Sequence, residues 1–329
     1  MDIDLSKEKS ETLGVEYGKM IREEGDLIQN EYLGTFRWKQ GIKFPVLLPP
    51  NSNFYKELTL STEKWTTFIS NRVTFELEPF FLDAMSFPLT VISGLNTIFE
   101  KQSSFLKEKI LNIVIIGASA RAEERIALET NYFDEIYFYI KERSENNDII
   151  VNIFFSGDEI TSTNTYTSKN SKNLIYNFIP GNTGDYLKKY ALDFSKTNVI
   201  FAGLNTGFGA GYKKLTISWI VDLCKILKFN FVTIFSYTND YEDKVGELGI
   251  FEKLLDAKFL HKKEENEFKA MTTYKSEEKE NQWSCANYGL YIIQGSNNKN
   301  IINDIMKMDK KLLEEKVLKT LTDVGIEIK

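Results

Sequence analysis

The residues best suited to chemistry in this 329-residue chain come directly after four apolar segments of β-strand composition. In a parallel α/β sheet the carboxyl ends of the strands meet at one edge, and ligands bind there. Amide, hydroxyl and carboxylate groups at that edge could bind a ligand that carries hydroxyl groups or a positive charge. The candidate ligand-binding residues are Gly117, Ser119, Glu123, Asp158, Glu159, Asn205, Gly207 and Asp240.

The turn after residues 111–117 limits which ligand could bind. It begins with Gly117 but lacks the second and third glycines of the dinucleotide motif G-x-G-x-x-G. Ser119 could cap the next helix, whose free N–H groups would suit an anion. Glu123 and Glu124 already place negative charge in this region, so a pyrophosphate would be repelled. The alternative is that Ser119 and both glutamates only stabilise the start of the helix and bind nothing.

Two further turns supply polar groups. Asp158 or Glu159 takes the place of the ribose-binding acid of a nucleotide fold, and the alternative is that both are solvated surface residues. The segment 205–211 is rich in glycine, which lets the backbone approach a ligand closely. It does not match the P-loop motif, so a flexible crossover loop is an equal alternative. Asn205 is the first-choice polar contact in this segment.

No catalytic residue is assigned. No histidine follows these strands, so acid–base chemistry would need Asp158, Glu159, Asp240 or a tyrosine with a shifted pKa. Cys285 has no recognisable histidine partner and is expected to be a small buried hydrophobic residue. His261 is flanked by lysines and glutamates, which predicts an exposed loop. One histidine and two cysteines cannot assemble a zinc finger, and no metal site is expected.

Composition narrows the class of protein and its partners. The chain has 41 Lys and Arg against 47 Asp and Glu, a net charge of −6, and it lacks a long basic cluster. This argues against nucleic-acid binding. The acidic start has no apolar signal region and no apolar run approaches a membrane span, so a cytoplasmic protein that does not bind membranes is expected.

Hydrophobic periodicity predicts alternating strands and helices. Strands are expected at 111–117, 149–155, 174–179, 198–202, 231–235 and 288–293, with a weak strand near Phe259. Helices are expected at 120–130, 185–194, through Trp219 to Leu227, and at 242–255. Residues 131–144 fit both periods, and helix is favoured. The pattern predicts an α/β fold, a Rossmann-like or methyltransferase-like mostly parallel sheet with helices on both faces and an antiparallel late strand.

The chain divides into three parts along its length. Residues 1–58 are mixed and polar and are expected to be a partly disordered or docked leader. Residues 59–110 carry apolar side chains at helical spacing, which predicts an N-terminal helical layer. Residues 111–329 form the α/β domain, which ends in a helix from about residue 300. The second and third parts are expected to make a single globular unit.

Several short motifs give the chain a resemblance to a known family. They are the segment Met85-Ser86-Phe87-Pro88-Leu89-Thr90, Ile115-Ile116-Gly117-Ala118-Ser119 with a following Glu, Phe155-Ser156-Gly157-Asp158-Glu159, Leu204-Asn205-Thr206-Gly207-Phe208, Asp240, and Asn287. Over residues 65–295 the chain resembles the C-terminal domain of the mitochondrial splicing suppressor family, which there follows a MYND zinc finger. The cysteine count shows that the finger is missing here. The resemblance implies a Rossmann-type sheet, action through protein partners, and no securely attached enzyme activity.

Two functions of different classes are therefore expected. The first is a non-catalytic interaction or small-ligand-binding module, whose partner would be an unidentified protein or a small molecule. The second is an S-adenosylmethionine-dependent methyltransferase, whose cofactor would use the acids for its ribose hydroxyls. An NAD-dependent dehydrogenase is a weaker hypothesis than these two, because the dinucleotide motif is missing.

Overall fold

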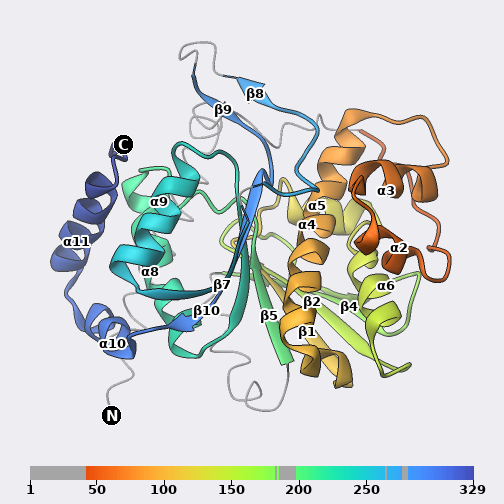
Figure 1. Cartoon of the computed structure of the whole chain (residues 1–329), viewed down its shortest axis with the longest axis horizontal. Coiled ribbons are helices and arrows are strands. Elements are labelled where there is room, and N and C mark those ends of the chain that lie inside the picture. The colour runs from red at the N-terminus through yellow and green to blue at the C-terminus, as the bar shows by residue number, and fades with distance from the viewer. Residues whose placement is uncertain (1–41, 182–183, 185–197, 264, 276–280) are drawn as a thin grey trace.

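An eight-stranded sheet lies at the centre of the protein, in a computed structural model that describes residues 42–181, 184, 198–263, 265–275 and 281–329 (Figure 1). The strand order is β3-β4-β2-β1-β5-β6-β10-β7. Five of these strands pair in parallel: β1 (Ile110–Ile116), β2 (Ile150–Gly157), β4 (Leu174–Pro180), β5 (Asn198–Gly203) and β6 (Val232–Tyr237).

Three strands run against their neighbours. Strand β10 (Gly289–Ser296) is antiparallel to both β6 and β7 (Ala257–Lys263), and it lies between them. The short strand β3 (Thr165–Thr167) is antiparallel to β4 at the other edge. The predicted Rossmann-like α/β fold with a late antiparallel strand is therefore confirmed.

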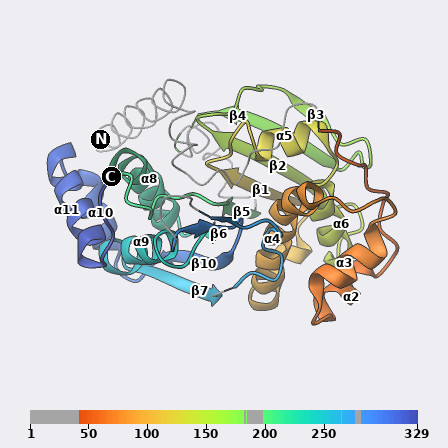
Figure 2. The ribbon, with the colours of Figure 1, turned by 90° about the horizontal axis from the view of Figure 1, so that it is seen from above.

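Helices cover both faces of the sheet (Figures 1 and 2). The helices cover both faces because β1 is apolar on both. Its alternate residues point to opposite faces, so Ile113 and Ile115 belong to one hydrophobic core, and Val114 and Ile116 belong to the other. The first core packs against α4 (Pro79–Lys101), α5 (Glu123–Glu129) and α6 (Asp134–Arg143). The second packs against α8 (Lys213–Lys228), α9 (Asp243–Gly249), a π-helical turn (Ile250–Leu254), α10 (Lys299–Lys307) and α11 (Lys310–Asp323).

Helix α4 is the core helix of the first face. In the part of the chain that the structure describes, it alone is long and apolar enough to cross a membrane, and 89% of its apolar window is buried. The 3-10 turn Ser103–Lys107 then leads into β1. Burial of this helix inside the fold accounts for its apolar sequence without a bilayer.

Several element predictions need correction. Helix α6 confirms the helical reading of 131–144, because Ile136 and Ile140 are buried one turn apart. The tail forms two helices instead of one, because Asp309 begins α11 by accepting a hydrogen bond from the Leu312 N–H at 2.9 Å. His261 lies in the edge strand β7 and not in a loop. The sequence did not predict β3 or the hairpin of β8 (Tyr274–Lys275) and β9 (Trp283–Ser284), which projects from the sheet.

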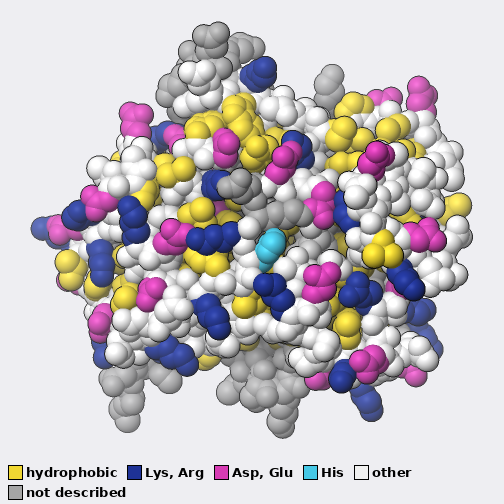
Figure 3. Space-filling view, in the orientation of Figure 1, with side chains coloured by type: hydrophobic (Ala, Val, Ile, Leu, Met, Phe, Trp, Pro, Cys, Tyr) yellow, Lys and Arg dark blue, Asp and Glu magenta, His cyan; other side chains and the backbone are white. Residues whose placement is uncertain are grey.

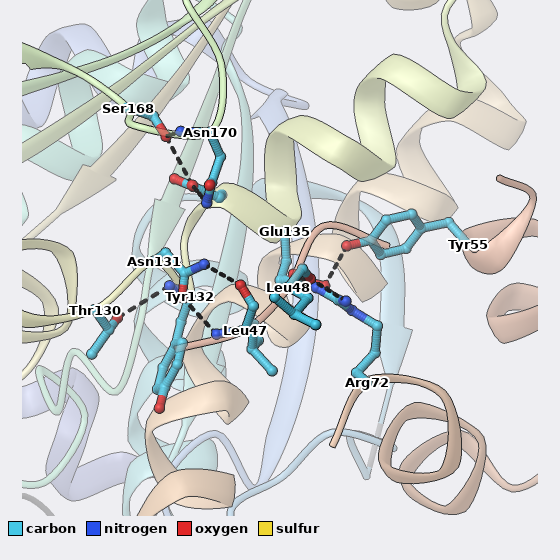
Figure 4. A network of polar contacts seen from close by, with 11 residues as sticks. Leu47, Leu48, Tyr55, Arg72, Thr130, Asn131, Tyr132, Glu135, Ser168 and Asn170 are labelled. Atoms are coloured by element: carbon cyan, nitrogen blue, oxygen red, sulfur yellow. Dashed lines mark hydrogen bonds and ion pairs between the residues drawn. The ribbon is translucent and has the colours of Figure 1, made fainter. Parts of the chain in front are cut away.

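The N-terminal layer begins with α2 (Phe54–Leu60) and α3 (Lys64–Arg72). The Tyr55 hydroxyl donates to Glu135 of α6 at 2.5 Å, and Arg72 forms a buried ion pair with the same carboxylate (Figure 4). The side chain of Asn131 pairs with both backbone groups of Leu47, at 3.1 and 2.7 Å. Residues 42–72 are therefore attached to the body. The rest of the predicted leader and the predicted helix 185–194 lie outside the described residues.

Candidate functional site

All four candidate turns lie at the same edge of the sheet. Strands β2, β1, β5 and β6 are parallel neighbours, so their carboxyl ends point the same way. The chain continues from β1 to β2 on one side and later places β5 on the other side of β1. The order therefore reverses between β1 and β5, and such a switch point is where open α/β sheets bind ligands.

The first turn is packed tightly against the protein itself. Gly117 has a φ of +66°, and a Cβ atom added there would lie 2.4 Å from the Trp219 ring of α8. The Ala118 N–H donates to the Ser156 carbonyl at 3.0 Å, and a Cβ on Gly157 would lie 1.9 Å from the Ala118 oxygen. These glycines are required by contacts within the fold, whatever binds beside them.

Glu123 closes the same turn from the helix side. Its carboxylate accepts a hydrogen bond from the Ser119 N–H at 2.9 Å. The Ser119 hydroxyl accepts from the Ala122 N–H at 3.1 Å, but α5 begins at Glu123, so Ser119 caps the turn before the helix and not the helix itself. Burial raises the pKa of Glu123 to about 7, and the nearby charge of Glu159 adds to the rise. The space that a phosphate would need is thus taken by a side-chain carboxyl.

Glu124 has a different partner from the one expected. It is buried, and it accepts hydrogen bonds from the backbone N–H groups of Thr161 and Ser162 at 3.0 and 2.6 Å and from the Thr161 hydroxyl. This carboxylate joins α5 to the loop after β2. Its role in the structure is therefore to attach that loop, in addition to any interaction with the helix dipole.

The acids after β2 are half-buried and not fully solvated. Burial raises the pKa of Glu159, and the positive charge of Arg121 opposes that rise. Glu159 is close enough to Glu123 for its negative charge to raise the pKa of Glu123. We call Glu123 and Glu159, with Asp158 next to Glu159 in the sequence, the acidic edge. Such groups accept hydrogen bonds from hydroxyls and attract cations.

Asn205 lies in a polar network, and its amide already has a partner. Its Nδ2 donates to Asn287 Oδ1 at 3.0 Å, and its Oδ1 accepts from the Asn287 N–H at 2.6 Å. The Ser236 hydroxyl also donates to Asn287 Oδ1 at 2.7 Å, and Asn287 Nδ2 donates to the Ser86 hydroxyl at 3.0 Å. Ser86, Asn205 and Asn287 come from three separate motifs of the family resemblance, and the fold brings them together.

Gly207 lies in a loop that is attached to α9. Burial raises the pKa of Glu247 well above its usual range, and Glu247 accepts hydrogen bonds from the Thr206 and Tyr291 hydroxyls at 2.8 and 2.6 Å. The Gly207 N–H also donates to this carboxyl. The sequence reasoning missed Glu247, because periodicity alone gives no signal for a buried acid on a helix. This part of the glycine-rich segment is buried, and the Gly207 N–H is bonded to a carboxyl of the fold itself.

Asp240 is exposed at the end of β6 and belongs to a separate aromatic region. Its charge acts on the pKa of both Tyr241 and Tyr288, which are raised first by burial and further by Asp240. The eight candidates thus share one edge but form three groups: the acidic edge with Ser119 and Gly117, the Asn205–Asn287 network with the glycine-rich loop, and Asp240 with the aromatic residues.

Comparison with known proteins adds no assignment. No protein-family model matches the chain, and no curated protein sequence matches it significantly. Among the described residues, no group of three His, Cys, Asp or Glu side chains is arranged to hold a metal ion.

Proposed function

We propose that this protein is a non-catalytic module that binds a small ligand at the acidic edge, and that the ligand carries hydroxyl groups or a positive charge. The observation that carries the proposal is the placement of Glu123 and Glu159 in the chain that follows β1 and β2, where the negative charge of Glu159 acts on the Glu123 carboxyl. A carboxylate after the second strand is suited to the hydroxyls of a ribose. The partner is therefore a nucleoside-like or cationic small molecule.

The first turn argues against a ligand that binds through a pyrophosphate. The Ser119 N–H, which could otherwise bind a phosphate oxygen, donates to Glu123. A phosphate here would have to displace a buried carboxyl, and it would meet the charge of Glu159. Nucleosides are therefore expected to bind better than the corresponding nucleotides.

The family resemblance supports a non-catalytic role. The domain that the chain resembles has no securely attached enzyme activity and is linked to protein partners. We propose a cytoplasmic location. A protein partner would use a surface other than the acidic edge.

A thermal-shift panel tests the ligand proposal, because a ligand that binds only the folded state raises the melting temperature. Adenosine should raise it more than ADP does, and Glu159→Gln should reduce the adenosine effect. Glu129→Gln, at the exposed far end of α5, is the matched control and should behave like the parent protein. No stabilisation by any nucleoside, or equal stabilisation in Glu159→Gln, would show that the acidic edge does not bind this class.

An S-adenosylmethionine-dependent methyltransferase is the second candidate, and the position of β10 in the sheet is compatible with it. Strand β10 is inserted in antiparallel orientation between β6 and β7, as expected for a methyltransferase-like sheet. The cofactor's sulfonium is positively charged and its ribose carries hydroxyls, so both suit the acidic edge. Calorimetry with S-adenosylmethionine and S-adenosylhomocysteine at millimolar concentration tests this candidate. Absence of binding to both compounds would exclude it.

A further inference from the structure

A second cluster with its own chemistry lies at the same edge, at the base of the β8–β9 hairpin. It consists of Tyr241, Trp283 and Tyr288, which we call the aromatic cluster. All three side chains are half-buried. Figure 3 shows hydrophobic side chains gathered on this face below the hairpin, with acidic and basic side chains beside them.

The rings of the aromatic cluster stand steeply to one another. The Trp283 and Tyr288 rings are 4.8 Å apart at their centroids with an interplanar angle of 72°, and Trp283 and Tyr241 are 6.0 Å apart at 65°. Rings that are steeply inclined to one another can face a single cation from different sides, and the faces of aromatic rings are electronegative.

The backbone holds this arrangement in place. The Tyr241 hydroxyl donates to the Trp283 carbonyl at 2.9 Å and accepts from the Trp283 N–H at 3.1 Å. The Cys285 N–H donates to the Thr238 carbonyl at 2.9 Å, which ties the base of the hairpin to the end of β6. The rings therefore do not need to be ordered by a ligand, and this lowers the cost of binding.

Charges around the aromatic cluster favour a cation. The exposed Asp240 precedes Tyr241 directly, and its negative charge acts on both tyrosines. The Lys269 ammonium lies 5.3 Å from the centroid of the Tyr288 ring, and Glu265 pairs with it at 2.5 Å. One ring face thus already holds a cation of the chain's own, which shows the kind of group that this environment accepts.

We propose that the aromatic cluster and Asp240 form a binding site for a methylated ammonium group, such as a quaternary amine on a small molecule or peptide. A methylated ammonium carries positive charge with little hydration, so it suits aromatic faces better than a bare ammonium does. This inference does not rest on the proposed function, because the acidic edge and the aromatic cluster are separate groups of residues. A negative binding result at one site would therefore not count against the proposal for the other site.

Choline is the probe, and dimethylbutanol, in which carbon replaces the quaternary nitrogen, is its neutral isostere. The chain has four tryptophans, so the indole N–H signals can be followed individually by NMR. Choline should shift the signal that is missing in Trp283→Leu, and the isostere should shift it much less. Equal shifts with both compounds, or no shift with choline, would overturn the proposal.

Variants separate a binding site from a packing cluster. Trp283→Leu should weaken choline binding about five-fold or more, as should Asp240→Asn to a smaller extent. Phe229→Leu, which removes a ring that is 55% exposed elsewhere, is the matched control and should leave binding unchanged. Lys269→Gln should strengthen binding, because it removes the competing ammonium. If Lys269→Gln weakens binding instead, Lys269 supports the cluster as a structural cation and the proposal fails.

Discussion

Asn205 and Asn287 hold each other through two hydrogen bonds although 82 residues separate them in the sequence. Both have left-handed backbones, with φ of 51° and 54°. Asparagine tolerates this conformation better than most residues with a side chain. The pair fastens the loop after β5 to the start of β10, so it sets the geometry of the sheet edge where the candidate residues lie.

Replacement of Asn287 should be costly. Asn287→Ala removes the partners of Asn205, Ser236 and Ser86 and leaves buried polar groups unsatisfied, so we expect a loss of about 2–4 kcal/mol of unfolding free energy. Urea denaturation of Asn287→Ala and the parent protein measures this loss.

Asn205→Gly and Asn205→Ala both lose the amide, but the alanine variant should lose about 1 kcal/mol more unfolding free energy, because Asn205 has a left-handed backbone. Equal stability of these two variants would contradict the backbone argument.

Gly117 and Gly325 form a natural pair for testing the closed first turn. Both have positive φ, +66° and +85°, but a Cβ meets the Trp219 ring only at Gly117, and nothing lies within 4 Å at Gly325. Gly325→Ala should therefore cost only about 1 kcal/mol for its backbone. Gly117→Ala should cost about 1–3 kcal/mol more, because the ring must move. Similar melting temperatures for the two variants would show that Trp219 yields freely.

A single substitution in the buried ion pair of Arg72 and Glu135 should destabilise the fold more than replacement of both residues. Arg72→Met leaves a buried carboxylate without its cation, and we expect a loss of about 3–5 kcal/mol in denaturant unfolding. Adding Glu135→Leu should recover much of that loss. The exposed pair of Lys319 and Asp323 is the control, and its disruption should cost less than about 1 kcal/mol. A double variant as unstable as Arg72→Met would contradict this account.

Stability should depend on pH through Glu123. Its pKa is raised from 4.5 in the unfolded chain to about 7 in the fold, so the folded state binds its proton more tightly. The resulting stabilisation is complete below pH 4.5 and is lost as pH rises through 7, by on the order of 3 kcal/mol. Glu123→Gln keeps an acceptor for the Ser119 N–H and cannot ionise.

Denaturant unfolding of Glu123→Gln and the parent protein between pH 4.5 and 8 checks this effect. The difference between them should grow in favour of Glu123→Gln as pH rises. Glu129→Gln, on the exposed end of the same helix, should follow the parent at every pH. A constant difference across the range would mean that Glu123 does not titrate in this window.

The sequence by itself determined the longer strands of the sheet, because they are apolar on both faces and the intervening helices carry buried residues at helical spacing. It also determined which turns share one edge, because consecutive parallel strands point the same way. Residues 131–144 were ambiguous in period, and only burial of Ile136 and Ile140 against the sheet decided for a helix. The local hydrophobic pattern was sufficient to identify an element wherever that element buries one face.

The tertiary structure alone decided what each candidate side chain does. Glu123 bonds the Ser119 N–H, and Asn205 is paired with Asn287 from a distant turn. The aromatic cluster around Trp283 depends on a hairpin that has no periodic signal. Such partners come from segments far apart in the chain, so their distances and burial depend on how the layers pack. Spacing along the sequence carries no information about that packing.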